Sequence, residues 1–588
     1  MYLLGNLPDE FLERYLYQID PNNIQEGPKG QIAHREAIEH LDRLAPKLHS
    51  IGDSAWCYVG NGLSNQTFVK GPEGLIAIDT GESNEEMAAA LVALREVTQE
   101  PIVACIYSHF HYVNGTQAIL DEGHLGHIDI YAHEGIPANL ERFGGEIAPR
   151  SGRGLVHQFG TMLPESGEDG LLHCGLGLFY RNQNHAPFTA GYLPANLTFS
   201  DRLKVIIAGL EVHLSHAPSD ATDSITIWFP ELKICVNNLL WPALFNVFAI
   251  RGEEYRDPRI LLQGLDEIAS FAPDHLIGTH GPPLSQHDAQ QENGQDLVNQ
   301  IHGYRDTIQY MWDQTVRLAN KGRTLDEISS EIRLPDTLKE TYLTQEFYGL
   351  VEHHVRQIHS GLFGWFDENP AHLFSLPEQE KHKRLIDGFG GYERVVSEAD
   401  QAFAAGDLTW AIELATWLTT QEETNQSDRD RLAKLLRNAG QHATAANIRN
   451  WCLTKALELE GTIDLARQRT HRFGRGQVMA APPTRFVSTL KVLVDPTLAQ
   501  GITGELAWHF AGGEKTGLRL RNSVAVPTNG VYADAILGLS HETWADVLSE
   551  RQNFWAAVSE GTISIAGDET FVEAFFSAIE LRSLQRSD

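Results

Sequence analysis

The stretch IYSHFHYVNGT, residues 106–116, is the part of the sequence around which the fold and the site can be worked out. The apolar run from Ile102 to Tyr107 predicts a buried strand that ends just before the histidines. On an extended segment His109 and His111 would point to the same side, because side chains on a strand alternate with a period of two. The two imidazoles could therefore share one metal ion, although a His-x-His pair alone is a weak signal.

Other strand ends along the chain carry the same kind of polar residues. Before the histidines, GPEGLIAIDTGES (71–83) predicts a turn, a strand and a sharp stop at Asp79. After them come HAPSDATDSITIWFP (216–230), LKICVNNLLW (232–241) and LIGTHGPP (276–283), each an apolar strand bordered by His, Asp or Asn. Polar groups at the ends of several strands are what a metal site assembled from loops requires.

These motifs, in this order, resemble the metallo-β-lactamase superfamily and, more closely, its zinc-dependent alkylsulfatases. The resemblance continues through residues 150–164, 245–258, 304–328, 347–373 and 388–414. It implies an α/β fold, the αββα metallo-β-lactamase sandwich, followed by an all-α dimerisation domain and a small α+β sterol-carrier-like domain. We place these domains at 1–290, 291–465 and 486–588, with a basic, Gly- and Pro-containing linker at 467–485.

The metal loop departs from the family pattern HxHxDH. Val113 and Asn114 stand at its last two positions, and a second family carboxylate corresponds to Asn237. A catalytic zinc needs three protein ligands and an open position for water. The resemblance supplies one such set, so we expect one Zn²⁺ per chain and leave a second open. The implied ligands are His109, His111 and Asp220, with His280 almost alone at the second site.

Two roles stay open at this point. Asp220 occupies the position of a metal-binding glutamate in alkylsulfatases, but His216 stands where the broader lactamase family has its third histidine, and Asp223 is a further candidate. His280 is either a ligand of a second metal or the proton donor to the leaving group, a role that typically contributes about 10²–10⁴-fold to the rate.

The resemblance also implies an anion-binding part of the site. Asn246 and Arg251 in FNVFAIRG fall where the family contacts sulfate, and a guanidinium fork suits a tetrahedral oxyanion. The alternative is that Arg251 forms a surface ion pair with Glu253 or Glu254. Residues 136–200 form a long connection rich in Gly and Pro, in which aromatic residues such as Tyr192 are mixed with arginines. Such a loop is either a cover for a substrate with an apolar body and an anionic head or ordinary packing.

Composition limits the possible partners. The chain has 588 residues and a net charge of −32, which argues against nucleic acid and against anionic membrane surfaces. Five scattered cysteines do not form a disulfide framework. Neither a signal peptide nor a run of about 18 apolar residues is present, so we expect a cytoplasmic protein without a membrane span. Residues 1–45 are expected to form an irregular helical arm.

Three functions follow from these observations. The first is a metal-dependent hydrolase that resembles alkylsulfatases and cleaves an alkyl or amphiphilic ester of an oxyanion, a sulfate ester above all. The second keeps the fold and one metal but makes the protein a lyase or a hydrolase of a non-sulfate substrate. The third is a catalytically inactive protein that binds amphiphiles. The family resemblance also implies a homodimer formed through residues 291–465.

Overall fold

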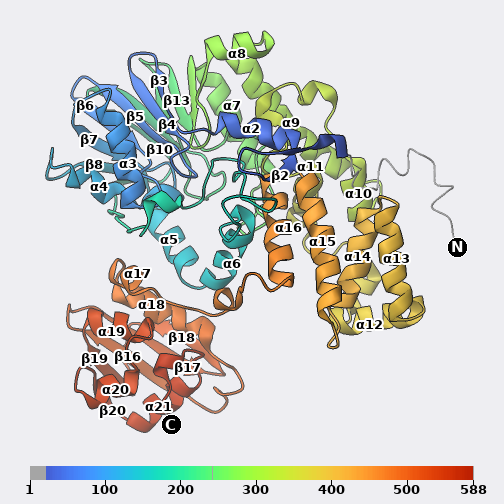
Figure 1. Cartoon of the computed structure of the whole chain (residues 1–588). Helices are drawn as coiled ribbons and strands as arrows, with labels where there is room; N and C mark the ends of the chain where they lie inside the picture. The colour runs from blue at the N-terminus through green and yellow to red at the C-terminus, as the bar shows by residue number, and fades with distance from the viewer. Residues whose placement is uncertain (1–20, 242, 587–588) are drawn as a thin grey trace. The chain divides into compact units, whose positions relative to one another are not determined.

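A computed structural model of the chain describes residues 21–241 and 243–586. The chain divides into two compact units (Figure 1). The first runs to Pro137 and resumes from Arg153 to Leu465, and the second comprises Ala138–Gly152 and the chain from Ala466 onward. The regions placed at 1–290 and 291–465 therefore lie together in the first unit, and the boundary at 290 stays a prediction.

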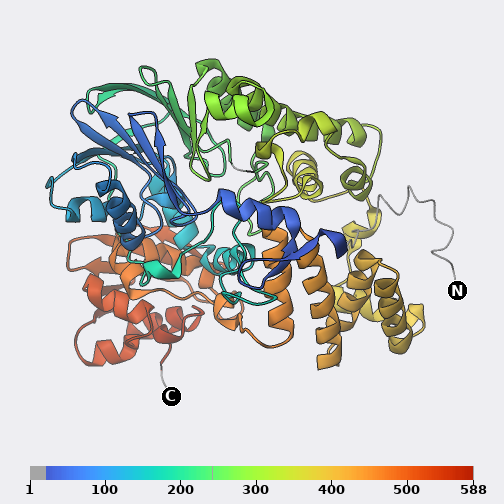
Figure 2. The same cartoon turned by 45° about the horizontal axis from the view of Figure 1, so that its top comes forward.

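Two sheets form the core of the first unit (Figure 2). In the seven-stranded sheet, β3 to β6 are antiparallel and β6 to β9 are parallel. The strands of that sheet are β3 (Lys47–Ile51), β4 (Ala55–Val59), β5 (Gln66–Gly71), β6 (Gly74–Ile78), β7 (Ile102–Ile106), β8 (Asp129–His133) and β9 (Leu197–Phe199).

The second sheet has six strands and is antiparallel except where β13 pairs with β14. Its strands are β10 (Arg202–Ile207), β11 (Leu210–His216), β12 (Ile225–Phe229), β13 (Ile234–Asn237), β14 (His275–Gly278) and β15 (Leu284–Ser285). All five residues of β6 and all five of β12 are buried, as expected for strands covered on both faces. Apolar side chains of the two sheets pack into one core.

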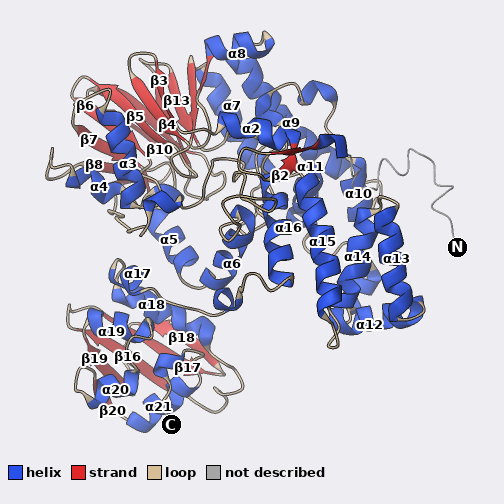
Figure 3. Cartoon of the chain, viewed as in Figure 1, coloured by secondary structure: helices blue, strands red, loops and turns tan. Residues whose placement is uncertain are grey.

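Helices, drawn in blue in Figure 3, lie beside the sheets, which are drawn in red. Ser83 caps α3 (Asn84–Arg95) by accepting a hydrogen bond from the backbone N–H of Glu86. Met87, Leu91 and Leu94 are buried at helical spacing. The other helices of the sandwich are α4 (Thr116–Asp121), α7 (Pro258–Phe271) and α8 (Gln286–Asn293), while α5 (Ile136–Gly144) and α6 (Ala148–Phe159) are each divided between the two units. The αββα prediction is confirmed.

The predicted all-α region is also helical. It includes two helical pairs, α13 with α14 and α15 with α16. The helices are α9 (Leu297–Ala319), α10 (Leu325–Glu331), α11 (Val351–Phe363), α12 (Glu378–Phe389), α13 (Tyr392–Ala404), α14 (Leu408–Thr419), α15 (Gln426–His442) and α16 (Ala446–Leu459).

The second unit contains a five-stranded sheet in the order β18-β17-β16-β19-β20. Its core is aromatic, with Trp508, Trp544 and Phe575 fully buried. The strands are β16 (Gly504–Phe510), β17 (Lys515–Arg521), β18 (Val524–Thr528), β19 (Ala535–Leu539) and β20 (Ser564–Gly567), and the helices are α17 (Arg475–Met479), α18 (Pro483–Thr489), α19 (His541–Leu548), α20 (Phe554–Ser559) and α21 (Glu569–Ser577).

Three local predictions need correction. The linker predicted at 467–485 contains α17 and the start of α18, and Phe473 and Val478 are buried in the core of the second unit. The connection 136–200 contains the helices α5 and α6. In the N-terminal arm, residues 35–43 form the regular helix α2 (Arg35–Arg43) after the short strands β1 (Ile24–Glu26) and β2 (Ile32–His34). Residues 1–20 of that arm lie outside the described part.

Gly154 lies where α6 packs closely against another segment of the first unit. A Cβ at this position would lie 2.7 Å from the backbone Cα of Arg251. The glycine therefore marks close packing of a helix against the segment that carries Arg251, within the connection that the sequence predicted to be either a substrate cover or ordinary packing.

Candidate metal centre

Three side chains from two loops converge at the carboxyl ends of the strands. His109 and His111 follow β7, and Asp220 comes from the connection between β11 and β12. The carboxylate Oδ2 of Asp220 lies 3.7 Å from Nε2 of His109 and 3.3 Å from Nδ1 of His111. These donor atoms all lie within 4.8 Å of one another. Elsewhere in the described chain, no other three His, Cys, Asp or Glu side chains form such a group.

A turn brings the two histidines together, and not the extended segment that was predicted. The strand ends at Ile106, and Phe110–Tyr112 form a 3₁₀ turn. The rings of His109 and His111 therefore meet edge to face, with centroids 5.0 Å apart. Because of this turn, His109 presents Nε2 and His111 presents Nδ1 to the same carboxylate.

A hydrogen-bonded chain fixes the tautomer of His109. The hydroxyl of Ser108 donates to Oδ2 of Asp79 at 2.6 Å, so its oxygen is left to accept from Nδ1–H of His109 at 2.8 Å. The backbone N–H of Ser108 donates to the other oxygen of Asp79. The lone pair of His109 then sits on Nε2, which is buried without a hydrogen-bond partner. Asp79, at the predicted sharp stop, has φ 58°.

Asn238 orients the carboxylate of Asp220. Its amide nitrogen donates to Oδ1 of Asp220 and, at 3.1 Å, to Ser224. Its amide oxygen accepts from Thr279 at 2.6 Å and from the indole of Trp241 at 3.2 Å. Oδ2 of Asp220 is thereby turned toward the two histidines.

Burial and charge set the protonation states of these groups. Burial lowers the pKa of His109 to about 3. Burial acts to raise the pKa of Asp220, but His109 and His111 beside it hold that pKa well below its usual range. At neutral pH the cluster therefore offers a neutral His109 and an ionised Asp220. Burial acts to lower the pKa of His111, but its hydrogen bonds to Asp220 and Glu253 raise that pKa to about 9, so metal binding would release a proton from His111. The orphaned Nε2 of His109 and the facing carboxylate fit a metal ion, and the donor set of two nitrogens and one oxygen suits zinc.

The side chains of the second predicted site do not form such a cluster. Val113 is fully buried and bridges to Gly81 through its backbone. The side chain of Asn237 bonds to backbone groups of Leu239, Leu240 and Ile277, so Asn238, its neighbour, is the amide that reaches the site.

His280 lies near the cluster with one tautomer fixed. Its Nδ1–H donates to the backbone oxygen of Leu63 at 2.9 Å, which leaves the lone pair on Nε2. Burial lowers its pKa to about 4. A neutral imidazole with an accepting Nε2 suits the role of ligand or base better than that of proton donor.

A buried network of charges lies beside His111. Arg251 donates through Nε to Oε1 of Glu253 at 2.7 Å and also through Nη2. Arg256 donates to Oε2 of the same carboxylate, and Oε1 lies 3.6 Å from Nε2 of His111. The predicted ion pair between Arg251 and Glu253 is therefore present. It is buried and not on the surface as predicted, because the side chain of Glu253 is only 2% exposed.

The other predicted site residues lie in different surroundings. Asn246 is fully buried, with neither side-chain atom hydrogen-bonded. Its backbone oxygen accepts from Arg256 at 2.6 Å. Tyr192 packs against Tyr107, with ring centroids 6.1 Å apart. His216 stacks on His133 at 4.1 Å, which separates its ring from the donor cluster.

Asp223, the third candidate ligand, is 1% exposed. Both Asp223 and His133 lie next to Gly135. A Cβ built on Gly135 would lie 3.0 Å from Nδ1 of His133 and 3.3 Å from Cβ of Asp223, so these two side chains are close to each other. Of the three candidates for the third ligand, the structure thus brings Asp220 to His109 and His111.

Sequence reasoning missed Glu253 as a site residue, as well as Asn238. The signal for Glu253 was the repeated charge pattern RGEEYR, in which arginines stand on both sides of the acids. For Asn238 no signal separated it from Asn237 beside it.

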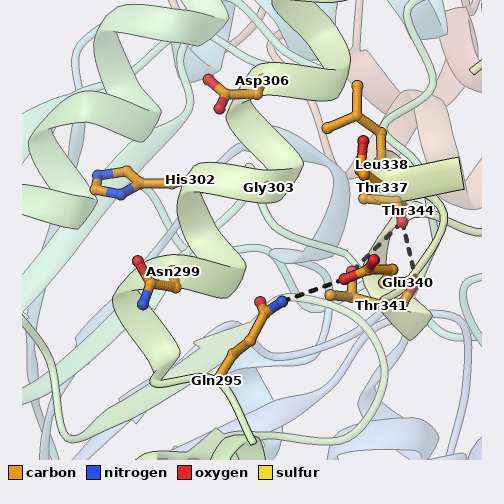
Figure 4. Close-up of a pocket in the computed structure, with 10 residues that line it drawn as sticks. All are labelled: Gln295, Asn299, His302, Gly303, Asp306, Thr337, Leu338, Glu340, Thr341 and Thr344. Carbon is orange, nitrogen blue, oxygen red and sulfur yellow. Dashed lines mark hydrogen bonds between the residues drawn. The ribbon is translucent and has the colours of Figure 1, made fainter. Parts of the chain in front are cut away.

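A groove of about 380 Å³ lies among the helices of the first unit (Figure 4). Its wall is polar, with Asn299, His302 and Asp306 from α9 on one side and Glu340 and Thr341 on the other. Gln295 donates to Glu340 across it at 3.4 Å. None of the predicted site residues lines this groove, so it is separate from the metal centre.

Comparison with known proteins agrees with this architecture. A linear primary-alkylsulfatase from Pseudomonas sp. (strain ATCC 19151) is 32% identical, over 87% of this chain and 98% of its own length. The chain belongs to the alkylsulfatase family. An alkyl/aryl-sulfatase from Saccharomyces cerevisiae is 26% identical over 90% of this chain and 81% of its own length.

Family models and a solved structure match the parts of this alkylsulfatase-family protein. The model described as alkyl sulfatase dimerisation matches residues 324–462, and the one described as alkyl sulfatase C-terminal matches residues 474–584. The fold resembles that of a stereoselective inverting sec-alkylsulfatase from Pseudomonas sp., with a TM-score of 0.80 and 24% identity over all of this chain and 95% of the other. Among the described residues, no helix has both the length and the apolar character that a membrane crossing requires.

Proposed function

We propose that this protein is a metal-dependent hydrolase of alkyl sulfates or closely related amphiphilic esters, working with one Zn²⁺ per chain. The observation that carries the proposal is the buried cluster of His109, His111 and Asp220 within an alkylsulfatase-family chain. The cluster offers three ligands, which is the number that a catalytic zinc takes from its protein.

The residues around the cluster would divide the work. Nε2 of His109, Nδ1 of His111 and a carboxylate oxygen of Asp220 would hold the metal. When bound, zinc lowers the pKa of a coordinated water and polarises the substrate oxygen. Asp79 and Ser108 keep the lone pair of His109 on the nitrogen that faces the site. Arg251 supplies positive charge for the head group, and the accepting Nε2 of His280 can take a proton from the attacking water.

Elemental analysis combined with turnover of decyl sulfate tests this proposal. We expect about one zinc per chain and release of inorganic sulfate that stops when the metal is removed and returns with zinc. Metal-loaded protein that leaves decyl sulfate intact but cleaves another decyl ester would favour a non-sulfate hydrolase on the same fold. Protein that binds neither zinc nor any other transition metal would refute the proposal.

We also propose that the protein forms a homodimer through the helical part of its first unit. The segment 363–376, within the residues matched by the dimerisation model, exposes large apolar side chains, with Trp365 73% and Phe374 83% exposed. Contiguous exposed apolar surface is typical of protein interfaces.

Light scattering at micromolar concentration should give the mass of two chains. Replacing Trp365 and Phe374 together by Ser should give the mass of one. Tyr532→Ser is the matched control, because Tyr532 is 79% exposed in the other unit. A double variant that stays dimeric would place the interface elsewhere.

A further inference from the structure

Glu253 provides a negative charge next to the arginine that is expected to bind the head group. Its carboxylate is enclosed by Arg251 and Arg256, whose side chains are 7% and 3% exposed. Arg251 donates to one oxygen of this carboxylate and Arg256 to the other, and the side chain of Glu253 is only 2% exposed. Two buried cations in direct contact with one carboxylate favour its ionised form.

The position of this carboxylate relates it to both halves of the site. Oε1 of Glu253 accepts two donors from Arg251 and lies 3.6 Å from Nε2 of His111. The other ring nitrogen of His111 faces Asp220 and the proposed metal. An oxyanion that approaches the metal beside Arg251 thus meets Glu253 within the same buried region and competes with it for the guanidinium.

The repulsion between Glu253 and a head group grows with the charge of that head group. A monoester of sulfate carries one negative charge, whereas a monoester of phosphate carries close to two above its second pKa of about 6. Since Coulomb energy is proportional to the product of the charges, the dianion experiences about twice the repulsion of the monoanion. Weak solvent screening inside a buried site preserves this difference.

We infer that Glu253 is a specificity-determining residue, which makes the site select monoanionic tetrahedral head groups, such as sulfate monoesters, over dianionic ones, such as phosphate monoesters. This inference rests on the proposed function, in that the head group binds beside Arg251. It assigns the discrimination between two head groups of the same shape to one buried carboxylate.

Calorimetric binding of decanesulfonate and decyl phosphate to metal-loaded protein at pH 8 tests the inference. The two probes share a chain and a tetrahedral head, and they differ in charge. In Glu253→Gln we expect the affinity for decyl phosphate to rise at least tenfold. The affinity for decanesulfonate should rise only about threefold, because the logarithm of the change follows the charge. Glu254→Gln, which removes an exposed neighbouring charge, should leave the ratio of the two affinities nearly unchanged.

A general disturbance of the site would change both affinities by the same factor and leave their ratio unchanged. That result would overturn the inference. Glu253→Ala is measured in parallel in case Gln beside two buried arginines prevents folding, and the same change in the ratio is expected. Hydrolysis of decyl sulfate is followed separately. A shifted ratio in a protein that does not cleave decyl sulfate would refute the proposed function and leave the charge selection standing.

Discussion

Replacing Asn238 by Ala should separate the stability of the fold from the affinity of the site for metal. Asn238 is 1% exposed and makes four side-chain hydrogen bonds, to Asp220, Ser224, Thr279 and Trp241. In Asn238→Ala the indole N–H and the Asp220 oxygen lose their partner inside the protein. A buried polar group left without a partner costs roughly 1–3 kcal/mol. We expect the free energy of unfolding of the metal-free protein to fall by about 3 kcal/mol, since water entering the space recovers part of the loss.

Metal affinity should also fall, because Asp220 is no longer held with Oδ2 toward the histidines. Groups that orient a metal ligand typically contribute about 10–100-fold to affinity. Titration with zinc against a competing chelator measures the loss of metal affinity. Thermal or urea unfolding of the metal-free protein measures the loss of stability.

Asn237→Ala is the matched control. The side chain of Asn237 also makes three buried hydrogen bonds, but all of them go to backbone groups. This variant should lose a comparable 2–3 kcal/mol, roughly one for each bond, and keep its affinity for zinc. If the two variants lost zinc affinity equally, or if Asn238→Ala bound zinc as tightly as the unchanged protein, the orienting role of Asn238 would be wrong.

Two further variants test the donor cluster and the pH dependence of stability. His109→Ala should bind no zinc by elemental analysis, while its circular dichroism spectrum remains that of a folded protein, because Nε2 of His109 bonds to no protein group. Zinc retained by this variant would contradict the proposed cluster. Burial lowers the pKa of His173 from 6.5 to about 3, so between these values the unfolded chain takes up a proton that the folded chain does not, and stability falls as pH falls. His173→Asn should reduce this slope by about 1.4 kcal/mol per pH unit in urea unfolding between pH 5 and 6, and an unchanged slope would show that His173 is protonated in the fold.

Apolar periodicity predicted the elements that position the site. Short runs such as LIAI and ITIWF have few alternatives to a buried strand, and polar residues directly after such runs must lie at the edge of the sheet. The resemblance implied Asp220 as the third ligand, while the residues themselves left His216 and Asp223 as alternatives. The sequence did not predict how the two histidines meet, because a 3₁₀ turn after the strand depends on packing around Phe110 and Tyr112.

Local sequence does not predict two features of the site, namely which asparagine faces Asp220 and that Glu253 is buried. Asn237 and Asn238 are chemically identical, and only the point at which β13 ends decides which amide faces Asp220. Glu253 lies in a segment of alternating charges that would normally be solvated. Its carboxylate is enclosed by Arg251 and Arg256, and Gly154, about a hundred residues earlier in the chain, permits the close approach of α6 to Arg251. Long-range packing therefore decides the electrostatics of the site.

If the site holds one metal ion, as we propose, its charges account for the departures of the sequence from the two-metal pattern. Two metal ions would add more positive charge than one, and the pattern HxHxDH supplies an acid that the buried Val113 lacks. With one divalent ion, Asp220 and Glu253 offset part of the charge of that ion and of the two buried arginines. Restoring a carboxylate at Val113 alone would bury a charge without a partner, which is costly. A second metal alone would lack ligands. Under the proposed function, the neutral residues Val113, Asn114 and Asn237 would thus be a consistent set for a site with one ion, in which Glu253 would control the charge of the substrate.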